Sequence, residues 1–168
     1  MTDKIKTDVL VIGAGIAGGT AALELADAGV EVTVVSLGGT PEASNTYWAQ
    51  GGIVFRGPDD SPHLLEKDIL HAGAGHNHPE AVRILAEEGP RLLEQILMEK
   101  MEVAFDREDD GSLSLVQEGS HSVPRIVHAS DATGRAVQMA LQERLHRHPN
   151  VRFLERHTAI DLLTPSHH

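Results

Sequence analysis

The chain has 168 residues, enough for one domain with a real core, and because only 3% are aromatic that core must be aliphatic. Cysteine is absent, which excludes disulfides, thiolate metal sites and a cysteine nucleophile, and no HExxH-type spacing suggests a metal. The net charge is −11 and Lys and Arg form no patch, so we expect no nucleic-acid partner. No apolar run could cross a bilayer and no signal-peptide pattern follows Met1, so we expect no membrane partner and a cytoplasmic location.

The first 36 residues predict a strand–turn–helix–strand unit. Asp8 to Ile12 is short, apolar and rich in β-branched residues, which predicts a strand buried on both faces. After a glycine turn, small and apolar residues recur at helical spacing from Thr20 to Ala28, and Gly29 suits a helix C-terminus. Glu31 to Ser36 predicts a second strand. Such a βαβ unit implies a parallel sheet, so the predicted fold class is α/β.

The rest of the chain predicts further helices and strands around one long loop. Leu37 to Ser61 is glycine-rich without periodicity, which favours a functional loop. Helices are predicted from Pro62 to about Gly73, from Pro79 to an interruption at Gly89-Pro90, from there to about Lys100, and from Ala132, capped by Asp131, to about His146. Strands are predicted as a hairpin from Val103 to Val116 turning at Asp110-Gly111, and at Val151–Leu154 and Thr158–Leu163.

A glycine motif lies between the first strand and the first helix. Gly13 allows a sharp turn, Gly15 lets phosphates approach the backbone, and Gly18 lets the helix sit close on the strand. Amides at the helix start and the positive end of its dipole then attract a pyrophosphate. The alternative is an ordinary tight turn, but the flanking strands and helix favour a dinucleotide site. This predicted site comprises Gly13, Ala14, Gly15, Ile16, Ala17 and Gly18.

The second strand ends in Ser36, where an Asp or Glu usually holds a ribose hydroxyl. A serine hydroxyl can form the same hydrogen bond without the charge. No Arg lies nearby to receive a 2′-phosphate, which disfavours NADP.

A second stretch, Ser44-Asn45-Thr46-Tyr47-Trp48-Ala49-Gln50-Gly51-Gly52-Ile53, offers hydroxyls, amides and a Gly-Gly pair. On chemistry alone it is equally well a solvated polar loop. Together with the glycine motif, however, it resembles the flavoprotein family that includes succinate dehydrogenase, fumarate reductase and L-aspartate oxidase. The resemblance implies FAD as cofactor and explains Ser36, since many members have Ser there. Members with a covalent flavin carry His where this chain has Asn45, so noncovalent FAD is implied.

The resemblance also implies which residues contact the cofactor. Aspartate oxidases often have Lys at the position of Leu37, so one polar contact differs. Besides the glycine motif, the implied cofactor-binding residues are Ser36, Leu37, Ser44, Asn45, Thr46, Tyr47, Trp48, Ala49, Gln50, Gly51, Gly52, Thr158 and Ala159.

A third stretch distinguishes among the family members. The segment from Glu118 to Gly134, EGSHSVPRIVHASDATG, is similar to the aspartate oxidase pattern, whereas the succinate and fumarate enzymes end this segment in DRTG. The resemblance implies oxidation of L-aspartate to iminoaspartate, with oxygen or fumarate as acceptor, as the first step of bacterial NAD biosynthesis. Quinolinate synthase is the implied partner. The alternatives are a fumarate reductase or succinate dehydrogenase-like flavoprotein, and a nucleotide-binding module without catalysis.

Glu118 is the strongest candidate for substrate recognition. A carboxylate would pair with the α-ammonium of aspartate and repel a plain dicarboxylate. The alternative is a solvated glutamate at the end of a hairpin. His121 and Ser122 are candidates to face the substrate or the flavin edge, or else they shape the loop. Arg125 and His128 are interpreted as structural residues, and Asp131 and Thr133 as helix caps.

Members of this family are several hundred residues longer than this chain. We therefore expect residues 1–168 to be the N-terminal portion of a Rossmann-like FAD-binding domain, with parallel sheet and flanking helices, incomplete in this chain. Later segments of that domain, a capping domain and a helical domain would supply the cations for the substrate carboxylates. The fragment alone should lack full turnover.

Overall fold

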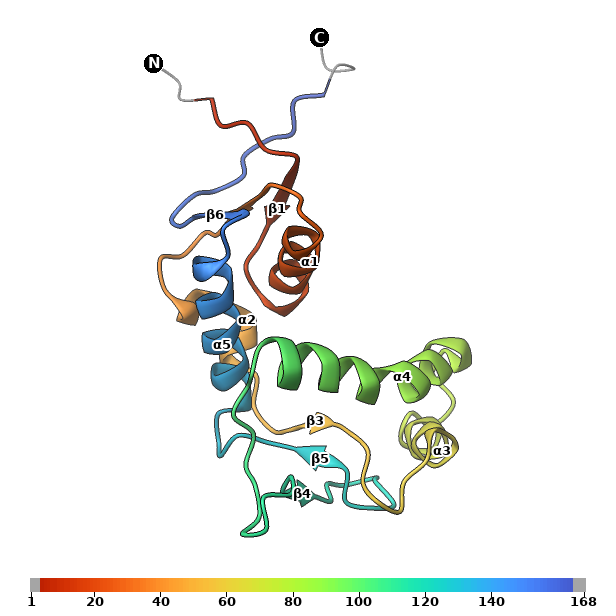
Figure 1. Ribbon diagram of the computed structural model, residues 1–168. Coiled ribbons are helices and arrows are strands. Elements are labelled where there is room, and N and C mark those ends of the chain that lie inside the picture. The colour runs from red at the N-terminus through yellow and green to blue at the C-terminus, as the bar shows by residue number, and fades with distance from the viewer. Residues whose placement is uncertain (1–3, 165–168) are drawn as a thin grey trace. The chain divides into compact units, whose positions relative to one another are not determined.

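The computed structural model describes residues 4–164 and forms two compact units (Figure 1). The first unit comprises the described residues up to Ala49 and from Val137 onward, and the second comprises Gln50 to Ala136. The elements in chain order are β1 (Val9–Ile12), α1 (Ile16–Asp27), β2 (Val32–Val35), the 3-10 turn η1 (Pro41–Ala43), α2 (Asn45–Trp48), β3 (Ile53–Val54), α3 (Pro62–Ala72), α4 (Pro79–Leu92), the π-helical η2 (Leu93–Lys100), β4 (Leu115–Val116), β5 (Ile126–Val127), α5 (Thr133–Arg147) and β6 (Val151–Leu154).

The first unit contains a parallel sheet with the strand order β1-β2-β6, as the βαβ pattern predicts. Val32 of β2 pairs with Val9 on one side and with Val151 on the other, so β2 is central and Val32 and Val34 are buried. Helix α1 contacts these strands, and its small and apolar residues on one side are buried. Leu141 of α5 packs against Gly19 of α1, which closes an aliphatic core.

Three expectations for the first unit are wrong. β1 is not buried on both faces: Leu10 is 47% and Ile12 54% exposed, and because exposure alternates along the strand, only one of its faces is covered. Helix α1 begins at Ile16 rather than Thr20, since the backbone becomes helical directly after Gly15. Thr158–Leu163 is not a strand, because it pairs with no described strand and its side chains are exposed.

The second unit contains an antiparallel sheet, β3-β5-β4, together with α3, α4 and η2. The loop predicted for residues 37–61 leads from the first unit into the second and is only partly irregular, since η1, α2 and β3 lie within it. The predicted turn at Asp110-Gly111 is confirmed: the amide of Gly111 donates to Glu108 O over 2.9 Å. The predicted strands around it are largely absent among the described residues, because β4 covers only Leu115–Val116 and pairs with β5.

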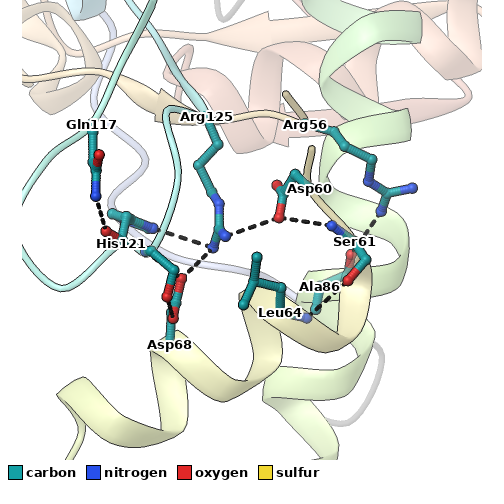
Figure 2. Close-up of polar contacts among 10 residues, drawn as sticks. Arg56, Asp60, Ser61, Leu64, Asp68, Ala86, Gln117, His121 and Arg125 are labelled. Carbon is teal, nitrogen blue, oxygen red and sulfur yellow. Dashed lines mark hydrogen bonds and ion pairs between the residues drawn. The ribbon is translucent and has the colours of Figure 1, made fainter. Parts of the chain in front are cut away.

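Pro90 does not interrupt its helix. Proline has no amide hydrogen, so the carbonyl four residues earlier, at Ala86, loses its helical donor. Arg56 Nη2 donates to that carbonyl over 3.2 Å and replaces the missing bond (Figure 2). The helix therefore continues through Pro90 to Leu92, and the backbone then becomes π-helical in η2.

The predicted caps are confirmed at one helix and differ at another. Ser61 Oγ accepts from the amide of Leu64 over 3.1 Å, and α3 ends at Ala72 before Gly73. Helix α5 begins at Thr133, one residue later than predicted, and the Thr133 hydroxyl accepts from the amide of Ala129 over 3.1 Å. Within residues 4–164, no helix combines the length and the apolar character needed to cross a bilayer.

Candidate functional site: a dinucleotide cradle and an acidic loop

The glycine motif forms a tight turn between β1 and α1. Gly13 has a φ of +107°, which L side chains rarely adopt, and its amide donates to Val35 O over 2.9 Å. A Cβ on Gly18 would collide with the carbonyl oxygen of Gly13, so the first turn of α1 lies directly on the backbone of the motif. The structure thus uses Gly13 for the turn and Gly18 for close packing, as predicted.

The amino end of α1 presents backbone amides. Gly15 is the N-cap residue and has no side chain of its own with which to cap the helix. The amide of Ile16 donates to Thr46 Oγ1 over 3.0 Å, which ties the second predicted stretch to the first. The first amides of a helix lack partners within it and carry the positive end of its dipole. This end of α1 is therefore suited to an anion.

A pocket of about 390 Å³ opens at this helix end, within the first unit. None of its described lining residues is Lys or Arg, so attraction for an anion depends on the amides and the helix dipole. Most predicted cofactor residues of the first unit meet here. The lining residues are Gly13, Ala14, Gly15, Ile16, Ala17, Gly18, Ser36, Leu37, Thr40, Ala43, Ser44, Asn45, Thr46, Gln138 and Gln142.

The other predicted cofactor residues of the first unit lie outside this lining. Tyr47 and Trp48 belong to α2, which Ser44 caps by accepting from the Tyr47 amide over 3.2 Å, and Ala49 follows them. The indole of Trp48 donates to Glu42 O over 2.8 Å. Thr158 and Ala159 are exposed and come directly after His157, whose amide donates to Ser36 O over 3.0 Å.

Gln138 is a pocket residue that sequence reasoning missed. Its side chain is fully buried, and Nε2 donates to Ala14 O over 2.8 Å, which fixes the backbone of the glycine motif. Its Oε1 is also buried and has no hydrogen-bond partner among the described residues. The signal was a polar residue within the apolar stripe of α5, between Val137 and Leu141, since a buried amide requires a partner.

In the second unit, Glu118 lies close to the Gln50-Gly51-Gly52 stretch. Its Oε1 is 3.9 Å from the place where a Cβ on Gly51 would stand, and the Glu118 side chain is exposed. Gly52 packs against Ile126 of β5. The second and third predicted stretches, far apart in sequence, therefore meet at the Glu118 carboxylate.

Arg125 is fully buried between two aspartates of the same unit (Figure 2). Its Nη2 lies 2.9 Å from Asp60 Oδ1, and its Nη1 lies 3.0 Å from Asp68 Oδ2. Burial pushes the pKa of Asp68 up, but hydrogen bonds from Ser122 and the charge of Arg125 outweigh it, so this pKa is lowered. Arg125 is a structural residue, as expected.

His128 is also engaged within the second unit. Its Nδ1 lies 3.0 Å from Asp106 Oδ2, and the same oxygen accepts from the amide of Ser130 over 2.8 Å. Because Ser130 has a φ of +46°, this contact holds a bend before α5, which agrees with the structural role expected of His128.

Comparison with known proteins identifies the family. The FAD binding domain family matches residues 8–167. The chain belongs to this family. FAD is therefore the cofactor of this FAD-binding domain, and the likeness to flavoproteins first noted in the motifs is confirmed.

The FAD-binding domain is 43% identical to L-aspartate oxidase 2-a, chloroplastic, of Nicotiana tabacum, over 94% of this chain and 24% of that protein. It is 44% identical to L-aspartate oxidase of Vibrio cholerae, over 94% of this chain and 30% of that protein. Among solved structures, the Mycobacterium smegmatis Sdh1 complex in the apo form matches with a TM-score of 0.78 and 27% identity, over 89% of this chain and 27% of that one. The chain thus spans 24–30% of the length of these relatives.

The residues of the pocket fit FAD. The diphosphate needs hydrogen-bond donors without side-chain crowding, and the amino end of α1 provides amides beside Gly15. Ser36 stands where a ribose hydroxyl is usually bound, and the free acceptor Gln138 Oε1 suits a hydroxyl donor. FAD, when bound, supplies a two-electron acceptor.

Proposed function

We propose that the full-length protein containing this FAD-binding domain oxidises L-aspartate to iminoaspartate, with oxygen or fumarate as the final electron acceptor. The relatives named L-aspartate oxidase, at 43% and 44% identity, support the substrate. Residues 1–168 would be the N-terminal portion of the FAD-binding domain, and the exposed Leu10 and Ile12 on edge strand β1 are consistent with cover by later segments. Iminoaspartate hydrolyses readily, so a partner such as quinolinate synthase would consume it.

The observation that carries this proposal is the placement of Glu118. Its carboxylate is exposed and lies beside the Gly51 backbone of the predicted cofactor stretch. A carboxylate there would attract the α-ammonium group, which aspartate has and succinate lacks. Glu118 would thus bind and orient the substrate amine, while His121 and Ser122 shape the same loop.

Replacing Glu118 with Gln should lower kcat/KM for L-aspartate by roughly 10- to 100-fold, because a hydrogen bond to a charged group contributes about 1.5–3 kcal/mol. Binding of succinate should stay the same or become tighter. Steady-state kinetics with aspartate and competition by succinate measure both quantities in the full-length protein. Glu108→Gln, at an exposed glutamate of the neighbouring hairpin, is the matched control. An unchanged preference for aspartate over succinate in Glu118→Gln would refute this assignment.

The flavin should be bound noncovalently. The resemblance places a flavin-linked histidine at the position of Asn45, and the amide of asparagine cannot form that bond. Asn45 lines the pocket and is exposed there. Acid precipitation of the holoprotein should release all the flavin absorbance into the supernatant. Flavin that stays with the precipitated protein would contradict the expectation.

A further inference from the structure

The loop that carries Glu118 has little packing of its own. It runs from Gln117 to Ser122, between β4 and β5, and is named here the Glu118 loop. Glu118, Gly119 and Ser120 are exposed, so burial of apolar surface contributes little to its conformation. Ser120 has a φ of +69°, a left-handed conformation that residues with a side chain adopt infrequently.

The end of the Glu118 loop is held by Asp68, which lies in the middle of α3. Its Oδ2 accepts from the Ser122 amide over 2.8 Å, and its Oδ1 accepts from Ser122 Oγ over 2.5 Å. The same Oδ2 is paired with Arg125, so one carboxylate fixes both the end of the Glu118 loop and the start of β5. Because Asp68 is buried and sits on a helix, it offers a rigid anchor.

Arg125 extends this anchor to His121. The guanidinium can only donate, so the contact of 3.4 Å between its Nη1 and His121 Nδ1 makes Nδ1 the acceptor. The proton of the neutral ring then sits on Nε2. Gln117 Nε2 donates to His121 O over 2.7 Å and secures the other side of the loop (Figure 2). The orientation of His121 is therefore set from α3 through Arg125.

The burial of Arg125 also excludes another role for it. Its side chain has no exposed surface, and two carboxylates already face it. A substrate carboxylate could reach the guanidinium only by displacing a buried aspartate, which would leave that charge unpaired. Arg125 therefore acts within the protein and not on the substrate.

We propose that Asp68 is a positioning residue for substrate selectivity, which through Ser122 and Arg125 fixes the conformation in which the Glu118 loop presents Glu118 and His121. The inference rests on the proposed function, since it takes Glu118 as the group that recognises the substrate amine. Asp60 provides the contrast: it pairs with Arg125, but its Oδ1 also accepts from the amide of Ser61, which is not part of the Glu118 loop.

Asp68→Ala should lower the preference for aspartate over succinate by about tenfold in the full-length protein, since it releases both bonds to Ser122. FAD content should stay unchanged, because Asp68 is not among the residues that line the dinucleotide pocket, all of which belong to the first unit. Asp60→Asn, which removes the other negative charge beside Arg125 but no bond to the Glu118 loop, should leave the preference within about twofold. The measured quantity is the ratio of kcat/KM for aspartate to the association constant of succinate, which is the reciprocal of its inhibition constant. An unchanged ratio in folded, FAD-loaded Asp68→Ala, or an equal loss in Asp60→Asn, would overturn the inference.

Ser122→Ala provides the test if Asp68→Ala does not fold. It removes the hydroxyl bond and keeps the amide bond, so the preference for aspartate should fall about threefold, through KM more than kcat. Ser122→Thr keeps the hydroxyl and should restore the wild-type ratio. No loss in Ser122→Ala, or no recovery in Ser122→Thr, would contradict the proposal. Glu118→Gln measured in parallel separates the two ideas: if it also has no effect the proposed function fails, and if it alone has an effect only the positioning role fails.

Discussion

Gly18→Ala should weaken FAD binding by about 10- to 100-fold and lower the midpoint of thermal unfolding. A Cβ at position 18 would collide with the carbonyl oxygen of Gly13 and touch Val11 at 3.2 Å. The obstacle is backbone, which cannot rotate away like a flexible side chain, so α1 must move from the glycine motif. Overpacking of this kind typically costs about 1–3 kcal/mol, and the displaced amides would no longer converge on the diphosphate. Quenching of flavin fluorescence measures the affinity.

Gly89→Ala is the matched control for this experiment. Gly89 lies within α4 of the second unit, and a Cβ there would meet only the flexible side chain of Leu85, at ordinary contact distances of 3.4 and 3.9 Å. Glycine costs about 0.5–1 kcal/mol relative to alanine inside a helix, so this change should stabilise the protein slightly and leave FAD affinity unaltered. Equal FAD affinity in both variants would show that the glycine motif does not depend on close packing at Gly18.

The features of this chain that sequence alone predicted are those encoded by neighbouring residues. The Gly13–Gly18 motif, strands β2 and β6, and the Ser61 cap of α3 each depend on a few consecutive positions. Burial of β1 on both faces was mispredicted because an apolar run does not show whether the rest of the chain covers one face of the strand or both. The strands of the second unit cover two residues each, too few for a period of two to be recognised.

The interruption expected at Gly89-Pro90 failed for a different reason. The local rule was correct, since proline removes a helical hydrogen bond, but the remedy came from Arg56, thirty positions earlier. The burial of Arg125 could not be predicted for the same reason, since its partners are distant in the sequence. Its partner Asp60 lies just before α3 and its partner Asp68 lies within α3, and the residues next to Arg125 in the sequence do not indicate either of them. In both cases a residue far away in the sequence supplies the missing hydrogen bond or the opposite charge, and a local sequence pattern cannot predict such a partner.

Arg125→Met should be strongly destabilising. Removing the guanidinium leaves the carboxylates of Asp60 and Asp68 buried without their shared cation, and breaking a buried ion pair typically costs about 3–5 kcal/mol. The midpoint of urea unfolding should therefore fall by roughly 1–2 M. The triple variant Arg125→Met/Asp60→Asn/Asp68→Asn carries no buried charge at these positions and should recover most of the loss. Failure of the triple variant to recover would show that packing of the long side chain, and not its charge, is what matters.

The pH dependence of the same variants separates charge from packing. The pKa of Asp68 is lower in the folded chain than its usual value of 3.8, so its contribution to stability is complete above that value and is lost as the pH falls through the folded pKa. In Arg125→Met the cation that helps to lower this pKa is gone, so the pKa of Asp68 should be higher than in the wild type, although the hydrogen bonds from Ser122 remain. Protonation then relieves the unpaired charge, so the stability gap between wild type and Arg125→Met should be widest near neutral pH and should shrink on acidification. A gap that is independent of pH, measured by urea unfolding between neutral pH and the acid limb, would assign the loss to packing alone.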